Sequence, residues 1–346
     1  MKRNLFIRTV GLVSCFLITL AILSSPMQSR AESAVQNIQI YSNPFGNATY
    51  VLSFALAEII NKHSTKLKAT CVESKGSAAN LLYLQKNPDA LKNTVILANP
   101  FAIRQAEKAD PPFKEAFSGM RAVSLIGNMG AFFATLNPDI KDVKQLAGKS
   151  LALGPKGITL DYVPRFVLDQ GVGVFKEVGR VSNMPFGAIK DALLDGTLDV
   201  GLQSSVMWGE GEEKEWVPIP ATDELLATKK VYELKISPDA AKIAREKTGY
   251  PIYFQKAKPM AFGKSEAIGG NRIIWSNSWW VHESMSNDIV TEICDIIYNH
   301  ANEFVKYHAS GRAITPKTMS TVATDVKDFH PAAIEFYKSK GLSIGQ

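Results

Sequence analysis

Strand-like runs that alternate with helix-like runs are the feature of this sequence that most limits its fold. Residues 35–41 alternate apolar and polar side chains, and Leu52, Leu56, Ile59 and Ile60 then mark one face of a helix. The runs LKATCVES, AANLLYLQKN and TVILA continue as strand, helix and strand. This alternation predicts an α/β fold with a mostly parallel sheet covered by helices.

The middle of the chain predicts a second lobe. MRAVSLIG and GAFFATL read as two strands separated by Asn128-Met129, and they look like a passage from one lobe to another. Strand and helix patterns then continue to LDVGLQ, and the strand-prone run NRIIWSNSWWVHESM precedes long helical patterns. We therefore expect a first lobe of residues 32–127 plus 236–346 and a second lobe of residues 128–235.

The N-terminal residues indicate export. Lys2, Arg3 and Arg8 precede the apolar run TVGLVSCFLITLAIL, and small residues end at Ala31. This pattern predicts a cleaved secretory signal peptide over residues 1–31 and a periplasmic mature protein. LVSC at Cys15 is similar to a lipoprotein attachment box, but the apolar run continues well past that cysteine.

Charge and cysteine usage exclude several classes of protein. The signal segment carries four positive charges and no negative one, so its removal lowers the formal net charge from +6 to +2. A nearly balanced chain gives no electrostatic reason to expect nucleic-acid binding. Cys71 and Cys294 are expected to be buried free thiols. No Cys-x-x-Cys pair occurs, and the histidines lack zinc-binding spacing, so no metal or cofactor is expected: His63, His282, His300, His308 and His330.

Two Lys-Gly turns each precede a helical pattern. They lie in ESKGSAANLL and in ALGPKGITLDYV. A glycine at such a turn lets backbone amides approach a ligand, and a helix N-terminus attracts anions. The two turns could therefore form two halves of one anion site, although each could also be an ordinary connection with a solvated lysine. Asp161 could hold a ligand amino group, but an acid in a first helical turn is favourable without any ligand.

Polar residues at predicted strand ends complete the candidate site, since open α/β sheets bind ligands there. If the last strand-prone run alternates regularly, Trp275 and Trp279 share one face and Trp280 takes the other. Trp275 could then line a pocket with Asn277, or the tryptophans could be hinge and core packing. The ligand-binding candidates are Asn43, Tyr50, Ser74, Lys75, Gly76, Ser77, Asn99, Lys156, Gly157, Thr159, Gln203, Trp275 and Asn277.

The sequence lacks the common enzyme motifs. AGKS and FGKS end like phosphate-binding loops, but the upstream glycine is missing, and Asp142-Val143 and Lys258-Pro259 stand there. The sequence contains no G-x-S-x-G elbow and no H-E-x-x-H helix. No catalytic residue is therefore expected.

The order of segments resembles the TAXI family of TRAP transporter solute-binding proteins. The most specific matches are LAGKSLALGPKG, KDALLDGTLDVG and the final helix beginning HPAAIEFYKSKGL. The resemblance covers the whole mature chain and implies a two-lobed periplasmic binding protein type II fold that delivers small carboxylates to a sodium-driven TRAP permease. The first ligand loop, YSNPFGNATY, departs from the family's glycine- and threonine-rich pattern, as does Ser74-Lys75-Gly76-Ser77.

These observations predict a monomeric solute-binding protein for a small organic anion. The ligand would be a carboxylate or dicarboxylate, with an aromatic acid or an amino acid also possible, held where closure brings the two lobes together. Two alternatives stay open, namely the binding protein of an ABC importer and an exported enzyme on the same fold. In the enzyme, Lys75 or Lys156 would hold or activate the substrate.

Overall fold

The computed structural model describes residues 35–45, 47–156, 159–209, 215–262 and 268–345. The expected signal peptide, with Cys15, lies outside the described residues, and so does Gly157. Among the described residues, no helix combines the length and the apolar character that a membrane crossing requires.

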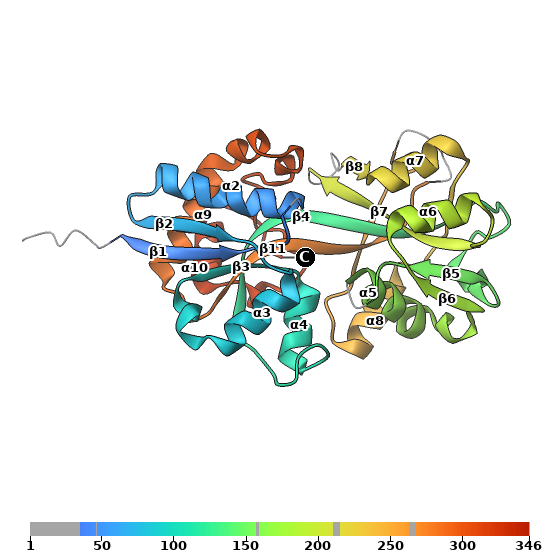
Figure 1. Cartoon of the computed structure of the whole chain (residues 1–346), viewed down its shortest axis with the longest axis horizontal. Helices are drawn as coiled ribbons and strands as arrows, with labels where there is room; N and C mark the ends of the chain where they lie inside the picture. The colour runs from blue at the N-terminus through green and yellow to red at the C-terminus, as the bar shows by residue number, and fades with distance from the viewer. Residues whose placement is uncertain (1–34, 46, 157–158, 210–214, 263–267, 346) are drawn as a thin grey trace, which may run out of the picture. The chain divides into compact units, whose positions relative to one another are not determined.

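The first part of the chain forms three parallel strands, each followed by a helix (Figure 1). Apolar residues at helical spacing produce the longest of these helices, and Leu52, Leu56, Ile59 and Ile60 are all buried, as predicted. Strand β1 lies between the other two and pairs in parallel with both. The bounds are β1 Gln36–Tyr41, α2 Ala48–His63, β2 Leu67–Val72, α3 Ser77–Lys86, the 3₁₀ turn η1 Pro88–Lys92, β3 Thr94–Ala98 and α4 Pro100–Lys108.

Two long antiparallel strands, β4 (Met120–Thr135) and β11 (Asn271–His282), cross the middle of the sheet. The sequence predicted two strands separated at Asn128-Met129, and this is wrong. Residues 128 and 129 are paired to β11 on one side and to β7 on the other, so the backbone continues without a turn.

The second part repeats the strand and helix pattern beyond β4. Its short parallel strands β5 and β6 lie at one end of the sheet, and β7 joins them to β4. The bounds are η2 Val143–Leu146, β5 Ser150–Leu153, α5 Thr159–Phe166, the π-helical turn η3 Val167–Val172, η4 Phe175–Glu177, β6 Arg180–Asn183, α6 Phe186–Leu194, β7 Val200–Trp208, β8 Glu215–Pro218, α7 Pro220–Thr228, β9 Tyr232–Glu233, α8 Asp239–Thr248 and β10 Tyr253–Lys256.

The sheet has the order β2-β1-β3-β11-β4-β7-β5-β6, with β8, β9 and β10 pairing to β7, β4 and β11. The chain after β11 forms helices, and α9 and α10 pack in the same core as the first three strands. Their bounds are α9 Asn287–His300, η6 Ala301–Lys306, η7 Ala309–Ala313, η8 Val326–Asp328 and α10 Pro331–Ser339.

Separate apolar cores lie at the two ends of the long strands. The first contains the apolar residues of β1 to β3, α2, α9 and α10, together with the first half of β4 and the second half of β11. The second contains residues of β5, β7, α5 and α8, together with Phe133 and Ile273 from the other halves of the long strands. These are the two lobes of the predicted α/β architecture.

The lobe boundary expected near residue 236 does not match this packing. Ala240, Ala244, Tyr250 and Ile252 belong to the second core, although residues 236–346 were assigned to the first lobe. The reason is that α8 and β10 are apolar on the side that covers the second core, and the chain leaves that core only along β11.

The tryptophans of β11 do not follow the simple alternation expected of them. The pairing of β11 with β4 shifts between Asn277 and Ser278, and again between Trp279 and Trp280. Trp279 and Trp280 are both buried in the first core, and half-buried Trp275 packs against the second.

Both cysteines described by the structure are free thiols, as expected. Cys294 is fully buried in the first core, whereas Cys71 is only half-buried, so the prediction of burial is right for Cys294 alone. Burial raises the pKa of Cys71 to about 11 and that of Cys294 to about 12, so both thiols are protonated and unreactive near neutral pH.

Candidate functional site

A cavity of about 310 Å³ lies beside the crossing strands, at the N-terminal end of α2. Its walls come from the loop after β1, the first turns of α2, the three neighbouring strands β4, β7 and β11, and the short turn η7. The described lining residues are Asn43, Asn47, Ala48, Thr49, Leu52, Ile126, Gly127, Asn128, Met129, Val206, Asn277, Ser310 and Ala313.

The loop between β1 and α2 is held by its own polar side chains. Asn43 Nδ2 donates to Thr49 Oγ1 at 2.6 Å, and Asn47 Nδ2 donates to the carbonyl oxygen of Pro44 at 3.2 Å. Asn47 stands at the N-cap of α2, but its side chain makes no capping hydrogen bond there. The first N–H groups of α2 therefore lack a side-chain cap from Asn47, at the end of the helix that borders the cavity.

Amide side chains dominate the polar part of the lining. The lining contains four asparagines and two hydroxyl residues, namely Asn43, Asn47, Asn128, Asn277, Thr49 and Ser310. None of the described lining residues is charged. Asn128 Oδ1 accepts a hydrogen bond from Ser276 Oγ at 2.6 Å, which leaves the Nδ2 group as the donor available to a ligand. No acidic residue lies in the first turn of α2. Amide donors at a helix N-terminus favour a ligand that carries negative charge.

The first Lys-Gly turn mainly joins strand ends to one another. Ser74 Oγ donates to the carbonyl oxygen of Ser42 at 2.5 Å and accepts from the Gly76 N–H at 3.0 Å. Gly76 has φ +102°, and a Cβ there would lie 3.0 Å from Asn43 Oδ1. The turn thus touches a cavity residue through its backbone, whereas the Lys75 side chain is exposed and lies outside the lining.

The neighbouring candidates Asn99 and Ser77 form hydrogen bonds near the same strand ends. Asn99 caps α4 by accepting from the Ala102 N–H at 2.9 Å, and its Nδ2 donates to Ser77 Oγ at 3.4 Å. The buried Asn80 donates to the carbonyl oxygens of Ser42 and Leu97 at 2.9 and 2.8 Å, which ties α3 to β1 and β3.

The described residues of the second Lys-Gly turn do not line the cavity. Lys156 is exposed, and half-buried Thr159 begins α5. Asp161 is buried in the first turn of α5 and accepts from Arg165 Nη2 at 2.7 Å and from Asn183 Nδ2 at 2.9 Å. Its carboxylate is therefore engaged within its own lobe.

The remaining candidates separate into different surroundings. Asn277 lines the cavity, but Tyr50, which packs edge-on against Phe45, does not. Gln203 is fully buried, and its Oε1 accepts from Thr222 Oγ1 at 2.9 Å. Trp275 packs against the second core. Of the thirteen candidates, the described lining thus contains Asn43 and Asn277.

Sequence reasoning missed Asn47, Thr49, Asn128 and Ser310 as cavity residues. Asn128 carried a usable signal, because an asparagine and two glycines inside an otherwise apolar run are unfavourable in a central strand without a special reason. Ser310 lies in a turn after α9 that no motif marks, and only the tertiary fold brings it to the cavity.

Apolar cores at the two ends of a pair of long antiparallel strands produce a two-lobed α/β fold, which periplasmic solute-binding proteins share. A TctC solute-binding protein from Polaromonas shares this fold with a TM-score of 0.51 at 15% sequence identity, over 80% of this chain and 86% of that one. The chain belongs to the NMT1-like family, whose model matches residues 40–341.

Two further solved structures have lower TM-scores. MatC from Rhodopseudomonas palustris, a structure with bound malate, has a TM-score of 0.44 at 14% identity, over 81% of this chain and 90% of that one. The aliphatic sulphonate binding protein SsuA from Escherichia coli has a TM-score of 0.45 at 11% identity, over 89% and 84%. No curated protein matches the chain significantly in sequence.

Proposed function

We propose that this protein is a periplasmic solute-binding protein that captures a small organic anion, a carboxylate or dicarboxylate, in the amide-lined cavity. The observation that carries the proposal is the meeting of four asparagine side chains with the N-terminus of α2, with no charged side chain among the described lining residues. The NMT1-like family membership and the fold support the binding role.

The energetics of such a cavity suit moderate affinity. Micromolar binding requires about 8 kcal/mol. Each hydrogen bond from an amide to a carboxylate contributes roughly 1.5 to 3 kcal/mol, and the helix N-terminus adds about 0.3 to 2 kcal/mol. Four such bonds are sufficient for micromolar binding without a lysine. We therefore assign the binding role to the amides of the cavity and not to the lysines of the two Lys-Gly turns.

The test compares acids with their neutral amides. Protein refolded to remove bound ligand is screened by thermal shift against succinate and succinamide, glutamate and glutamine, and benzoate and benzamide. A ligand at a hundred times its dissociation constant stabilises by roughly 2.7 kcal/mol, which raises the Tm by several degrees. We expect a shift with one acid and none with its amide, whereas a shift with the amide alone would contradict the anion proposal.

Variants then locate the site. Asn277→Ala should lower the affinity for the acid that binds at least about tenfold, because it removes a donor to a charged group. Lys75→Ala and Lys156→Ala should leave this affinity unchanged. If either lysine variant abolishes binding and Asn277→Ala does not, the amide-lined cavity is not the site.

Asn47→Asp offers a sharper test of charge. The carboxylate should stabilise the start of α2 by about 0.5 to 1 kcal/mol, measured as a higher Tm without ligand. It should also repel an anionic ligand and weaken its binding at least about tenfold, which isothermal titration calorimetry measures. Asn47→Ser caps the helix without charge and is the control, since it should raise the Tm while affinity stays within about threefold.

We propose further that the protein is a TAXI-type member that delivers its ligand to a TRAP permease. The support is the sequence resemblance along the mature chain. Uptake into proteoliposomes that contain the cognate membrane transporter tests it. Uptake driven by a sodium gradient agrees with the proposal, and uptake that requires ATP hydrolysis identifies an ABC importer instead.

Export is the remaining part of the proposal. The charged and apolar N-terminal pattern supports cleavage after Ala31. Mass spectrometry of the protein recovered from the periplasmic fraction should therefore find Glu32 as the first residue. Recovery of the uncleaved chain from the cytoplasm would contradict it.

A further inference from the structure

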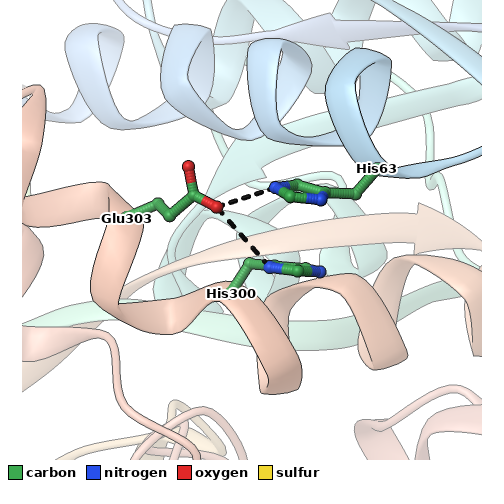
Figure 2. A group of neighbouring side chains, drawn as sticks. All are labelled: His63, His300 and Glu303. Carbon is green, nitrogen blue, oxygen red and sulfur yellow. Dashed lines mark hydrogen bonds and ion pairs between the residues drawn. The ribbon is translucent and has the colours of Figure 1, made fainter.

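Two histidines and a glutamate meet at the C-terminal end of α2, although His63 is distant in sequence from the other two. His63 is the last residue of α2, His300 is the last residue of α9, and Glu303 follows in η6 (Figure 2). His63 and Glu303 are 240 positions apart. The spacing among the histidines gives no sign of this group, because the packing of α2 against α9 and η6 creates it.

The three side chains turn their donor atoms toward one point. His63 Nε2 lies 2.7 Å from Glu303 Oε1, and His300 Nδ1 lies 3.5 Å from the same oxygen (Figure 2). One ligand atom from each residue lies within 4.8 Å of the others. The imidazole rings stack with centroids 3.5 Å apart, so both nitrogens face the carboxylate from the same side.

Two imidazoles and one carboxylate form a ligand set that zinc prefers. Zn²⁺ binds His nitrogen and carboxylate oxygen at about 2.0 to 2.2 Å, and tetrahedral geometry then separates neighbouring ligand atoms by about 3.3 Å. The His300 to Glu303 distance already matches this value. The His63 to Glu303 distance must open by roughly 0.6 Å, and the stacked rings must tilt apart. Rotation of the partly buried side chains can supply both changes.

We propose that His63, His300 and Glu303 form a Zn²⁺ site with a water molecule as fourth ligand. The metal would tie the end of α2 to the junction of α9 and η6. This site is separate from the cavity, which lies at the opposite end of α2, and the proposal does not depend on the proposed function.

Lys62 shapes this site and limits its affinity. Lys62 Nζ lies 2.8 Å from Glu303 Oε2, which orients the carboxylate and leaves Oε1 for the metal. Lys306 Nζ lies 3.8 Å from the same Oε2. These positive charges oppose a cation, but both lysine side chains are more than half exposed, so solvent screens them. We therefore expect micromolar rather than nanomolar binding.

The experiment measures binding of Zn²⁺ itself to untagged protein that has been stripped with a chelator. Titration near neutral pH against a chromophoric zinc indicator should yield one bound ion per chain. Co²⁺ in the same protein should produce the intense visible absorption of a tetrahedral site with nitrogen and oxygen ligands.

Variants separate this site from adventitious binding. Replacing any one ligand should lower the Zn²⁺ affinity at least about tenfold and abolish the Co²⁺ absorption. The three variants are His63→Gln, His300→Gln and Glu303→Gln. Glu292→Gln is the matched control, because it removes a nearby acid of α9 that is not a proposed ligand, and it should leave both signals unchanged. Circular dichroism confirms that each variant is folded.

Two results would overturn the proposal. One is the absence of stoichiometric Zn²⁺ binding by the stripped wild-type protein. The other is binding that persists unchanged in the folded His63→Gln and His300→Gln variants, which would identify an adventitious ion only. In either case the three residues with Lys62 form a hydrogen-bonded ion-pair cluster without a metal.

Discussion

The two ends of helix α2 carry opposite chemistry. Asn47, Ala48 and Thr49 at its N-terminal end border a cavity of amides and hydroxyls, and the first turn contains no acid. Lys62 and His63 at its C-terminal end join Glu303 and His300 in a charged cluster. A helix has partial positive charge at its N-terminus and partial negative charge at its C-terminus. One helix therefore favours an anionic ligand at one end and cationic groups at the other.

The middle of α2 connects these ends to the first core, and breaking that connection should have the largest effect. Trp279 Nε1 donates to Ser53 Oγ of α2 at 3.1 Å, and its ring packs against Phe304 of η6. Trp279→Ala should lower the free energy of unfolding by about 3 to 5 kcal/mol, because it leaves a large cavity and an unpaired hydroxyl. Urea unfolding measures this loss.

The control for this prediction is Trp275→Ala, which removes a half-buried tryptophan of the same strand at the second core. We expect a smaller loss there. A loss below about 1 kcal/mol in Trp279→Ala would mean that α2 is held by other contacts and that its two ends are independent.

Gly76→Ala should perturb only the N-terminal end. At φ +102° and ψ −170° a side chain is strained, and the new Cβ would press on Asn43 Oδ1. We expect a loss of about 1 to 3 kcal/mol in the free energy of unfolding and weaker ligand binding, with Zn²⁺ binding unchanged. Gly187→Ala in α6 has open space around it and should instead stabilise by up to about 1 kcal/mol. Equal thermal shifts in the two variants would contradict the backbone argument.

The smallest expected effect is a pH dependence of stability that arises from Glu292, beside the C-terminal end of α2. Burial alone would raise the pKa of Glu292, but hydrogen bonds from Lys66 and Ser64, at 2.8 and 2.7 Å, lower it below its ordinary value. A depressed carboxyl pKa contributes stability that is present above about pH 4.3 and is lost as the pH falls below it. The exposed lysine limits the contribution to less than about 1 kcal/mol.

Thermal unfolding of the wild type and Glu292→Gln from neutral to acidic pH checks this sign. The wild type should be the more stable above pH 5, and the difference should shrink as the carboxyl is protonated. A difference that grows at low pH would show that Glu292 is destabilising in the folded protein.

The α/β class was predictable because buried strands and helical faces leave periodic apolar patterns, as in α2. The cavity was harder to predict. The Lys-Gly turns were conspicuous, yet their exposed lysines lie outside the lining, and the strand-end polar groups of Ser74, Asn80 and Asn99 mostly bond to neighbouring backbone and side-chain groups. Asn128 and Ser310 reach the cavity only because distant segments pair or pack beside one another, which local spacing does not encode.

The shared long strands also affect how this chain can fold. Strand β4 supplies apolar residues to both cores, and its partner β11 is synthesised much later, with Asn128 and Ser276 separated by 148 positions. We expect that neither core folds autonomously, because each lacks a central strand until β11 has been synthesised. Pairing over such a separation slows folding, and it leaves the edges of β3 and β4 open to wrong partners during synthesis. Truncation before residue 282 should therefore yield an aggregation-prone fragment rather than a single folded lobe.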